Sequence, residues 1–223
     1  MIQPAQIRTV LFDLDGTLVN TAPDLVNALN VVLEHHNHPA VALADVSSLI
    51  STGAAGMLGY ALGDIPEQRK QLLVNELVEQ YHLHIADSSQ LYPEMENVLQ
   101  QLEQRGLQWG VVTNKVTRLT ESLLDKLNLA NRAVCIISGD TTAHSKPHPA
   151  PLLEACRITG TLPGNCVYIG DAKSDIEAAQ RAVMPSLAAA YGFIGTDDQP
   201  QLWGANAVVN NANQILDWVT QHV

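Results

Sequence analysis

The segment 9–21, TVLFDLDGTLVNT, decides how the rest of the sequence is interpreted. Its first four residues form a nearly continuous apolar run, which is typical of a fully buried strand. The run ends on Asp13 and Asp15, which a Gly-Thr pair follows at once. Burying an unpaired carboxylate costs on the order of several kcal/mol, so we expect positive charge close to the end of this strand.

Composition limits the class of protein. The 223 residues, 46% of them hydrophobic, suit one large domain or a core domain with a smaller insertion. No run approaches the roughly 18 apolar residues of a membrane helix, and a net charge of −11 disfavours nucleic acid, so neither partner is expected. The three cysteines form no CxxC pair and the first residues lack a signal-peptide pattern. We therefore expect a cytoplasmic protein, as a monomer or homodimer.

Strand-like and helix-like segments alternate along much of the chain. Apolar runs predict buried strands at 9–12, 108–113, 133–138 and 166–170, with weaker candidates at 186–190 and 207–210. Helical periodicity separates them, as in 93–106, which ends on Gly106. This alternation predicts an α/β fold with a Rossmann-like open parallel sheet.

The interval between the first strand and 108–113 contains no convincing strand. Residues 22–36 and 67–85 predict helices, and the apolar face of the second comprises Leu72, Leu73, Leu77, Val78 and Tyr81. The glycine-rich stretch 51–59, STGAAGMLG, is interpreted as a connecting loop. We predict a helical cap at 18–88, inserted after the first strand, and an α/β core formed by 1–17 and 89–223.

Reactive side chains cluster at the carboxyl ends of the predicted strands, which is where sites form in an open parallel sheet. They are Asp13, Asp15 and Thr17; Thr113, Asn114 and Lys115; Lys146; and Asp171 and Asp175. Carboxylates from two strands can share a divalent cation, and Lys146 adds a fixed positive charge. Together these groups supply the counter-charge that the first strand requires.

This set of groups permits phosphoryl transfer. A carboxylate can attack phosphorus in line and form an acyl phosphate, provided that a metal, a lysine and backbone N–H groups offset the repulsion between anions. Oxygen ligands favour Mg²⁺. Asp15 could donate a proton to the leaving alkoxide and later take one from water. For these separate roles the chain must bend after Asp13, and Gly16 is well placed to allow the bend.

Each signal also has a purely structural interpretation. A strand-ending threonine can be a cap, Lys146 an ordinary surface lysine, and the acids at 171 and 175 simple helix-starting residues. The histidines at 35, 36, 38, 82 and 84 are scattered over the predicted cap helices, where surface or core roles are expected. A catalytically silent binding protein is the corresponding alternative function. The complete set, in this order, favours the enzyme.

The motifs resemble those of a known superfamily. Asp13-x-Asp15-Gly16-Thr17, Thr113, Lys146 before a proline, and Gly170-Asp171 with Asp175 are similar to the four motifs of the haloacid dehalogenase superfamily of phosphohydrolases. The helical insertion after the first motif resembles the subgroup of phosphoglycolate phosphatases and β-phosphoglucomutases. A phosphosugar mutase therefore stays an alternative.

The resemblance implies roles for these residues. Asp13 would be the nucleophile and Asp15 the general acid/base. Phosphate would be held by Thr113, Asn114 and Lys146. Magnesium would be bound by Asp13, the backbone carbonyl of Asp15 and Asp171, with Asp175 supporting the site through water or Lys146.

Four longer segments are similar to the N-acetylmuramic acid 6-phosphate phosphatases of Gram-negative bacteria, which serve peptidoglycan recycling. They are 50–57, 108–115, 145–156 and 191–205. This resemblance implies a sugar phosphate with a lactyl carboxylate as substrate, with 2-phosphoglycolate as the alternative. Small residues near Thr52 and Gly53 would leave room for the ring, and Lys115 and Arg118 either reach the carboxylate or lie on the surface. One departure is Val183-Met184, where a glycine is expected before the next strand.

Overall fold

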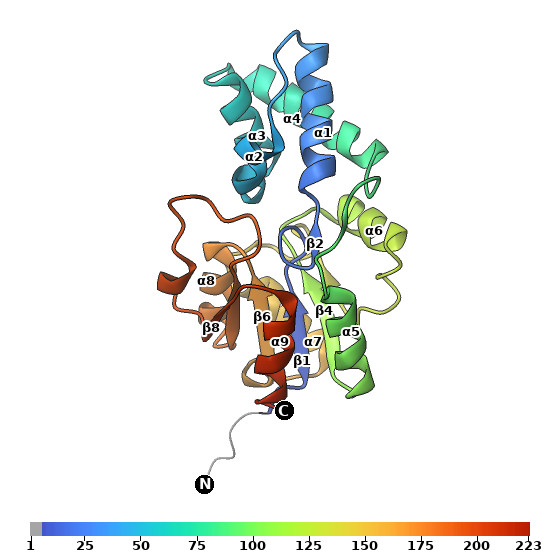
Figure 1. Cartoon of the computed structure of the whole chain (residues 1–223), viewed down its shortest axis with the longest axis vertical. Coiled ribbons are helices and arrows are strands. Elements are labelled where there is room, and N and C mark those ends of the chain that lie inside the picture. The colour runs from blue at the N-terminus through green and yellow to red at the C-terminus, as the bar shows by residue number, and fades with distance from the viewer. Residues whose placement is uncertain (1–5) are drawn as a thin grey trace.

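A six-stranded parallel sheet forms the centre of the structure, a computed structural model that describes residues 6–223 (Figure 1). The strand order is β5-β4-β1-β6-β7-β8. The strands are β1 (Thr9–Phe12), β4 (Gln108–Val112), β5 (Ile136–Ile137), β6 (Cys166–Gly170), β7 (Ser186–Ala189) and β8 (Ala207–Val209). Phe12 is in register with Val111 on one side and Ile169 on the other, so β1, β4 and β6 end at the same edge. The predicted α/β, Rossmann-like class is confirmed.

Helices cover both faces of the sheet. Successive side chains of a strand point to opposite faces, and those of β1 are buried on both. Val10 and Phe12 belong to the core that includes α5 (Met95–Gln104) and α9 (Ala212–Thr220). Leu11 packs instead with α7 (Ala150–Thr159) and α8 (Lys173–Arg181). The remaining elements of this part are α6 (Thr117–Lys126) and the short 3₁₀ turns Pro163–Asn165 and Pro200–Leu202.

Four helices lie beyond the carboxyl ends of the central strands, at the top of Figure 1, and are called the helical insertion here. They are α1 (Ala22–His35), α2 (Leu43–Val46), α3 (Gly53–Leu62) and α4 (Glu67–Leu83), with a 3₁₀ turn at Ser47–Thr52. The chain enters through β2 (Val19–Asn20) and leaves through β3 (Gln90–Leu91), which pair antiparallel. Among residues 6–223, no helix combines the length and the apolar character needed to cross a membrane.

The Asp24 side chain connects the start of α1 to the segment at Ser88 and Ser89, which leads back to the sheet. Its side chain is buried and accepts hydrogen bonds from Ser88 N at 2.9 Å, from Ser89 N at 2.8 Å and from Ser89 Oγ at 2.6 Å. A buried carboxylate with this many donors satisfies its oxygens without a cation. The two connections between the insertion and the sheet are therefore held side by side.

Three local predictions were wrong. Residues 53–62 form a helix rather than a loop, since Met57 and Leu58 supply a buried apolar face. Leu72 is 69% exposed because it lies one position away from the buried stripe of Leu73, Leu77 and Tyr81 on α4. The interval between β1 and β4, where no strand was expected, also contains the β2–β3 ribbon. Its two-residue strands are too short to show a periodic pattern in the sequence.

Candidate active site

Asp13 follows β1 directly, and the chain turns immediately after it. The Asp13 N–H still donates to Ile169 O of β6 at 2.8 Å, whereas Val19 N donates to Leu14 O at 2.9 Å and closes the turn. Gly16 has φ +83°, and a Cβ atom there would lie 2.2 Å from Asp171 Oδ2. Glycine is thus required both by the backbone conformation and by the close approach of β6. This turn separates Asp13 from Asp15.

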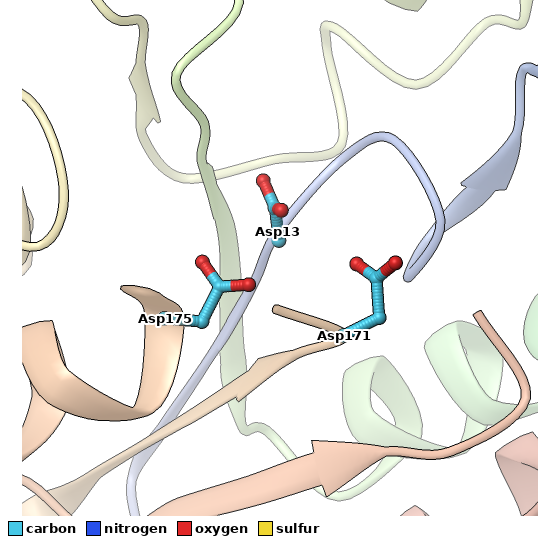
Figure 2. A group of neighbouring side chains, drawn as sticks. All are labelled: Asp13, Asp171 and Asp175. Carbon is cyan, nitrogen blue, oxygen red and sulfur yellow. The ribbon is translucent and has the colours of Figure 1, made fainter. Parts of the chain in front are cut away.

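Three carboxylates converge at the ends of β1 and β6 and at the start of α8 (Figure 2). One oxygen from each of Asp13, Asp171 and Asp175 lies within 4.8 Å of the others. Thr17 Oγ1 donates to Asp171 Oδ1 at 2.9 Å, and Phe193 N donates to its Oδ2 at 2.8 Å. Burial raises the pKa of Asp13 to about 7 despite a neighbouring lysine, and burial with the other carboxylates raises the pKa of Asp171 well above its usual range.

The positive charge expected beside these acids is Lys146. Its buried Nζ lies 2.9 Å from Asp13 Oδ1 and donates to Asp175 Oδ1 and Tyr168 Oη, both at 2.7 Å. Burial alone would lower the pKa of Lys146, but the two carboxylates outweigh it and raise the pKa. With all three carboxylates ionised, the single lysine leaves this cluster with a net charge of −2. A divalent cation with a preference for oxygen ligands fits that deficit.

Asp15 has a separate set of partners. Its Oδ1 accepts hydrogen bonds from Thr21 Oγ1 at 2.6 Å and from Lys115 Nζ at 2.7 Å. The Lys115 side chain is only 7% exposed, and its Nζ lies 4.6 Å from the centre of the Tyr81 ring. Burial would lower the pKa of Lys115, but the Asp15 carboxylate more than offsets this and raises it. Lys115 therefore lies in the site as a cation, not on the surface.

A cavity of about 250 Å³ lies between these groups and the helical insertion. Its floor is formed by side chains of the sheet edge, among them Asp13, Asp15, Thr113 and Lys146. Its roof is formed by α1, α3 and α4 and is largely apolar or small: Leu25, Gly53, Ala54, Met57, Leu77 and Val78. The arrangement brings the carboxylates of Asp13 and Asp15 and two ammonium groups to one cavity.

Comparison with known proteins agrees with this geometry. A sequence model of the family described as haloacid dehalogenase-like hydrolase matches residues 10–189. The chain belongs to the haloacid dehalogenase-like hydrolase family. This confirms the resemblance on which the sequence interpretation rests, and it makes the protein a hydrolase of the phosphatase type.

Relatives of this hydrolase have two different names. A phosphoglycolate phosphatase of Xanthomonas campestris pv. campestris is 40% identical over 210 residues, covering 94% of this chain and 95% of its own. An N-acetylmuramic acid 6-phosphate phosphatase of Pseudomonas aeruginosa is 36% identical over 215 residues, covering 95% and 94%. The crystal structure of a predicted phosphoglycolate phosphatase from Haemophilus somnus has a TM-score of 0.86 at 26% identity, covering 96% and 98%.

The structure of this hydrolase brings most of the predicted site residues together. Thr113 is buried at the cavity, and its Oγ1 accepts a hydrogen bond from Lys115 N at 3.1 Å. Asn114 also lines the cavity, but its side-chain amide bonds both to Lys146 N (2.9 Å) and to Lys146 O (3.0 Å). Its side chain thus holds the lysine loop, so the part of Asn114 left for a ligand is its backbone.

Two predicted substrate contacts lie elsewhere. Thr52 and Arg118 are outside the set of described residues that line the cavity. Thr52 Oγ1 donates to Leu49 O, and Arg118 donates from both Nη atoms to Glu79 on α4. Gly53, the neighbour of Thr52, does line the cavity.

Sequence reasoning missed two tyrosines of the site. Tyr168 lies in the middle of β6, and its hydroxyl accepts from Lys146 and donates to Val112 O at 2.8 Å. Tyr81 was taken for part of an apolar helix face, yet it lies beside Lys115. The only available signal was a hydroxyl-bearing side chain in each otherwise apolar stripe, which is too common to indicate a site.

Proposed function

We propose that this hydrolase is a magnesium-dependent phosphomonoesterase that works through an aspartyl-phosphate on Asp13 and whose substrate is N-acetylmuramic acid 6-phosphate. The activity belongs to the recycling of peptidoglycan sugars. Residues 18–88 act as a cap over the sugar, and the remainder supplies the chemistry.

Asp13 attacks phosphorus through Oδ2. Its Oδ1 accepts a hydrogen bond from Leu14 N at 2.8 Å and is paired with Lys146, whereas Oδ2 has no partner in the described part of the chain. Lys146, the Thr113 hydroxyl and the backbone of Asn114 hold the phosphate oxygens. Asp175 and Tyr168 keep Lys146 in place, so they act through it.

Asp15 exchanges the protons. Its Oδ1 is held by Thr21 and Lys115, which leaves Oδ2 to protonate the leaving oxygen of the sugar. The same oxygen then takes a proton from the water that hydrolyses the aspartyl-phosphate, so each turnover returns Asp15 to its starting state.

Magnesium fits the carboxylate cluster of Asp13 and Asp171, together with the backbone carbonyl of Asp15. When bound there, it supplies the positive charge that offsets repulsion between the nucleophile and the phosphate and stabilises charge in the transition state. The three carboxylates within 4.8 Å of one another, with one lysine among them, support this assignment.

The roof of the cavity supports a sugar as the leaving group. Its apolar and small side chains suit the C–H faces of a ring and its substituents. A two-carbon acid would leave most of this roof in contact with water, at a cost in binding free energy. Relatives named for N-acetylmuramic acid 6-phosphate, at 36% and 37% identity, agree with this substrate.

The second candidate substrate is 2-phosphoglycolate, because relatives at 40% identity are named phosphoglycolate phosphatase. The core chemistry would be the same. What differs is the fraction of the cavity that the leaving group fills, and side-by-side kinetics separate the two.

The deciding experiment measures phosphate release from both compounds, each with Mg²⁺ and with EDTA, and uses Asp13→Asn as the inactive control. We expect kcat/KM to favour the sugar phosphate by orders of magnitude, only with Mg²⁺ and only in the unmodified protein. Preference for 2-phosphoglycolate would refute the substrate, and turnover of either compound by Asp13→Asn would refute the mechanism. As a readout besides activity, Mg²⁺ should raise Tm in the unmodified protein and much less in Asp171→Asn.

A further inference from the structure

Tyr81 carries a buried hydroxyl without a hydrogen-bond partner among residues 6–223. The side chain is 1% exposed, comes from the buried stripe of α4 and lines the cavity. Phenylalanine would fill the same space without leaving a polar atom unsatisfied. A buried donor that pairs with nothing in the protein costs stability, so it points to a ligand atom that pairs with it.

Lys115 provides a second donor beside this hydroxyl. Its Nζ lies 4.6 Å from the centre of the Tyr81 ring, and the only hydrogen bond it makes to the described residues goes to Asp15 Oδ1. An ammonium carries three N–H groups, so others are available to a ligand. Lys115 comes from the end of β4 and Tyr81 from the helical insertion, so a group bound between them touches both parts of the molecule.

The surroundings of this pair offer a ligand few other polar contacts. Leu77, Val78 and Leu119, which also line the cavity, offer no polar side-chain atom. The alternative cation, Arg118, is 52% exposed and already bonded to both carboxylate oxygens of Glu79. Apart from the exposed hydroxyl of Ser51, Lys115 and Tyr81 are therefore the donors that the cavity offers to the part of a substrate farther from phosphorus.

We propose that Tyr81 and Lys115 form a subsite for a carboxylate carried by the leaving group of the substrate. Both groups donate, one of them is positively charged, and a carboxylate accepts from both. A carboxylate offers one acceptor oxygen to each of the two donors, whereas a hydroxyl or an acetamido group offers a single acceptor oxygen to both. The substrate class is thus the phosphomonoesters of carboxylic acids. This inference rests on the proposed function and deepens it.

Two matched pairs of esters test the subsite. N-acetylmuramic acid 6-phosphate is compared with N-acetylglucosamine 6-phosphate, which lacks only the lactyl group, and 2-phosphoglycolate with 2-hydroxyethyl phosphate. The quantity of interest is the ratio of kcat/KM between the acid and the neutral member. Tyr81→Phe should lower this ratio about 10- to 100-fold for the pair that contains the substrate, the range for a hydrogen bond to a charged group.

The loss should be mainly in KM, because a carboxylate remote from phosphorus is held equally before and during the reaction. Tm of Tyr81→Phe should equal or exceed that of the unmodified protein, since the hydroxyl has no partner to lose. Tyr60→Phe, in the same insertion but 53% exposed, is the matched control and should leave the ratio unchanged. Lys115→Gln should lower the ratio too, along with kcat for both members, because it also contacts Asp15.

An unchanged ratio in Tyr81→Phe, or an equal loss on both members of a pair, would overturn the subsite. In that event Mg²⁺-dependent turnover that Asp13→Asn abolishes would still support the proposed function. If the folded, unmodified protein hydrolyses no member of either pair, the proposed function fails and the subsite fails with it.

Discussion

At the scale of single residues, the site depends on how Lys146 is held among acids. Its ammonium lies between Asp13 and Asp175, and the tyrosine hydroxyl of β6 is the neutral member of the group. That hydroxyl accepts from Lys146 and donates to Val112 O, so it links the lysine to the end of β4. The position of the charge beside Asp13 therefore depends on a residue that is not among those lining the cavity.

Tyr168→Phe should reveal this positioning. The change removes the hydroxyl that accepts from Lys146, while Lys146 Nζ keeps its own hydrogen bond to Val112 O at 3.2 Å, so we expect a cost of about 0.5–1.5 kcal/mol in unfolding free energy. We expect kcat to fall about tenfold with a smaller change in KM, because the ammonium can then shift toward Asp175, and one hydrogen bond of this kind corresponds to about that factor. Steady-state kinetics measure kcat and KM, and urea unfolding measures the change in unfolding free energy. A lowered stability with unchanged kcat would mean that the tyrosine is only structural.

The residues of the candidate site were predictable where chemistry and position coincide. Asp13, Asp171 and Lys146 follow apolar runs, and the parallel-sheet rule brings such ends together before any coordinates are known. Asn114 was harder, because nothing in a sequence shows that its amide is used by the Lys146 backbone. Tyr81 was missed, because a tyrosine at helical spacing is usually core.

At the scale of elements, the turn from α8 to β7 uses an unusual residue. Val183, where a glycine was expected, has φ +55° and its side chain is 81% exposed. Val183 N donates to Gln180 O and Met184 N to Ala179 O, a helix end of the kind that glycine normally closes. The left-handed conformation needed for this turn is kept, and a β-branched side chain is strained by it.

Val183→Gly should therefore stabilise the protein. Relief of about 1–2 kcal/mol of strain is partly offset by the greater freedom of glycine in the unfolded chain, so we expect a net gain of about 0.5–1 kcal/mol. Val183→Ala keeps the Cβ atom and should gain less. The urea midpoint measures both, and a loss of stability in Val183→Gly would show that the valine is not strained.

Strongly periodic elements were predictable, and short ones were not. The apolar runs of β1, β4 and β6 are each longer than three residues and fully buried or nearly so, which makes them visible in the sequence. β5 is two residues long, Ile136 and Ile137, although Val134 N also donates to Trp109 O and Cys135 O accepts from Val111 N, so more of the apolar run at 133–138 lies along β4. Helix α3 contains three glycines, which disfavour helices, yet burial of Met57 and Leu58 outweighs that propensity.

At the scale of the whole molecule, the helical insertion faces the sheet edge across the cavity. Besides the β2–β3 ribbon, α6 joins the two through Lys126, whose Nζ donates to Ile85 O at 2.8 Å, and through Arg118. Arg118 Nη2 donates to Glu79 Oε2 at 2.8 Å and lies 2.9 Å from His82 Nδ1. These contacts hold the insertion over the acids, so they favour the form in which the cavity is enclosed.

Arg118→Gln should loosen this enclosure without touching the chemistry. The apparent affinity for substrate scales with the fraction of molecules in the binding-competent form, so we expect KM to rise about two- to fivefold while kcat stays close to its original value. The pair is exposed, so screening at about 0.5 M salt should shrink the difference between the variant and the unmodified protein.

Arg157→Gln is the matched control, because Arg157 forms a similar two-pronged pair with Glu154 inside α7 and joins nothing across the cavity. Equal KM values for Arg118→Gln and the unmodified protein at low salt would show that the cavity stays enclosed without this contact.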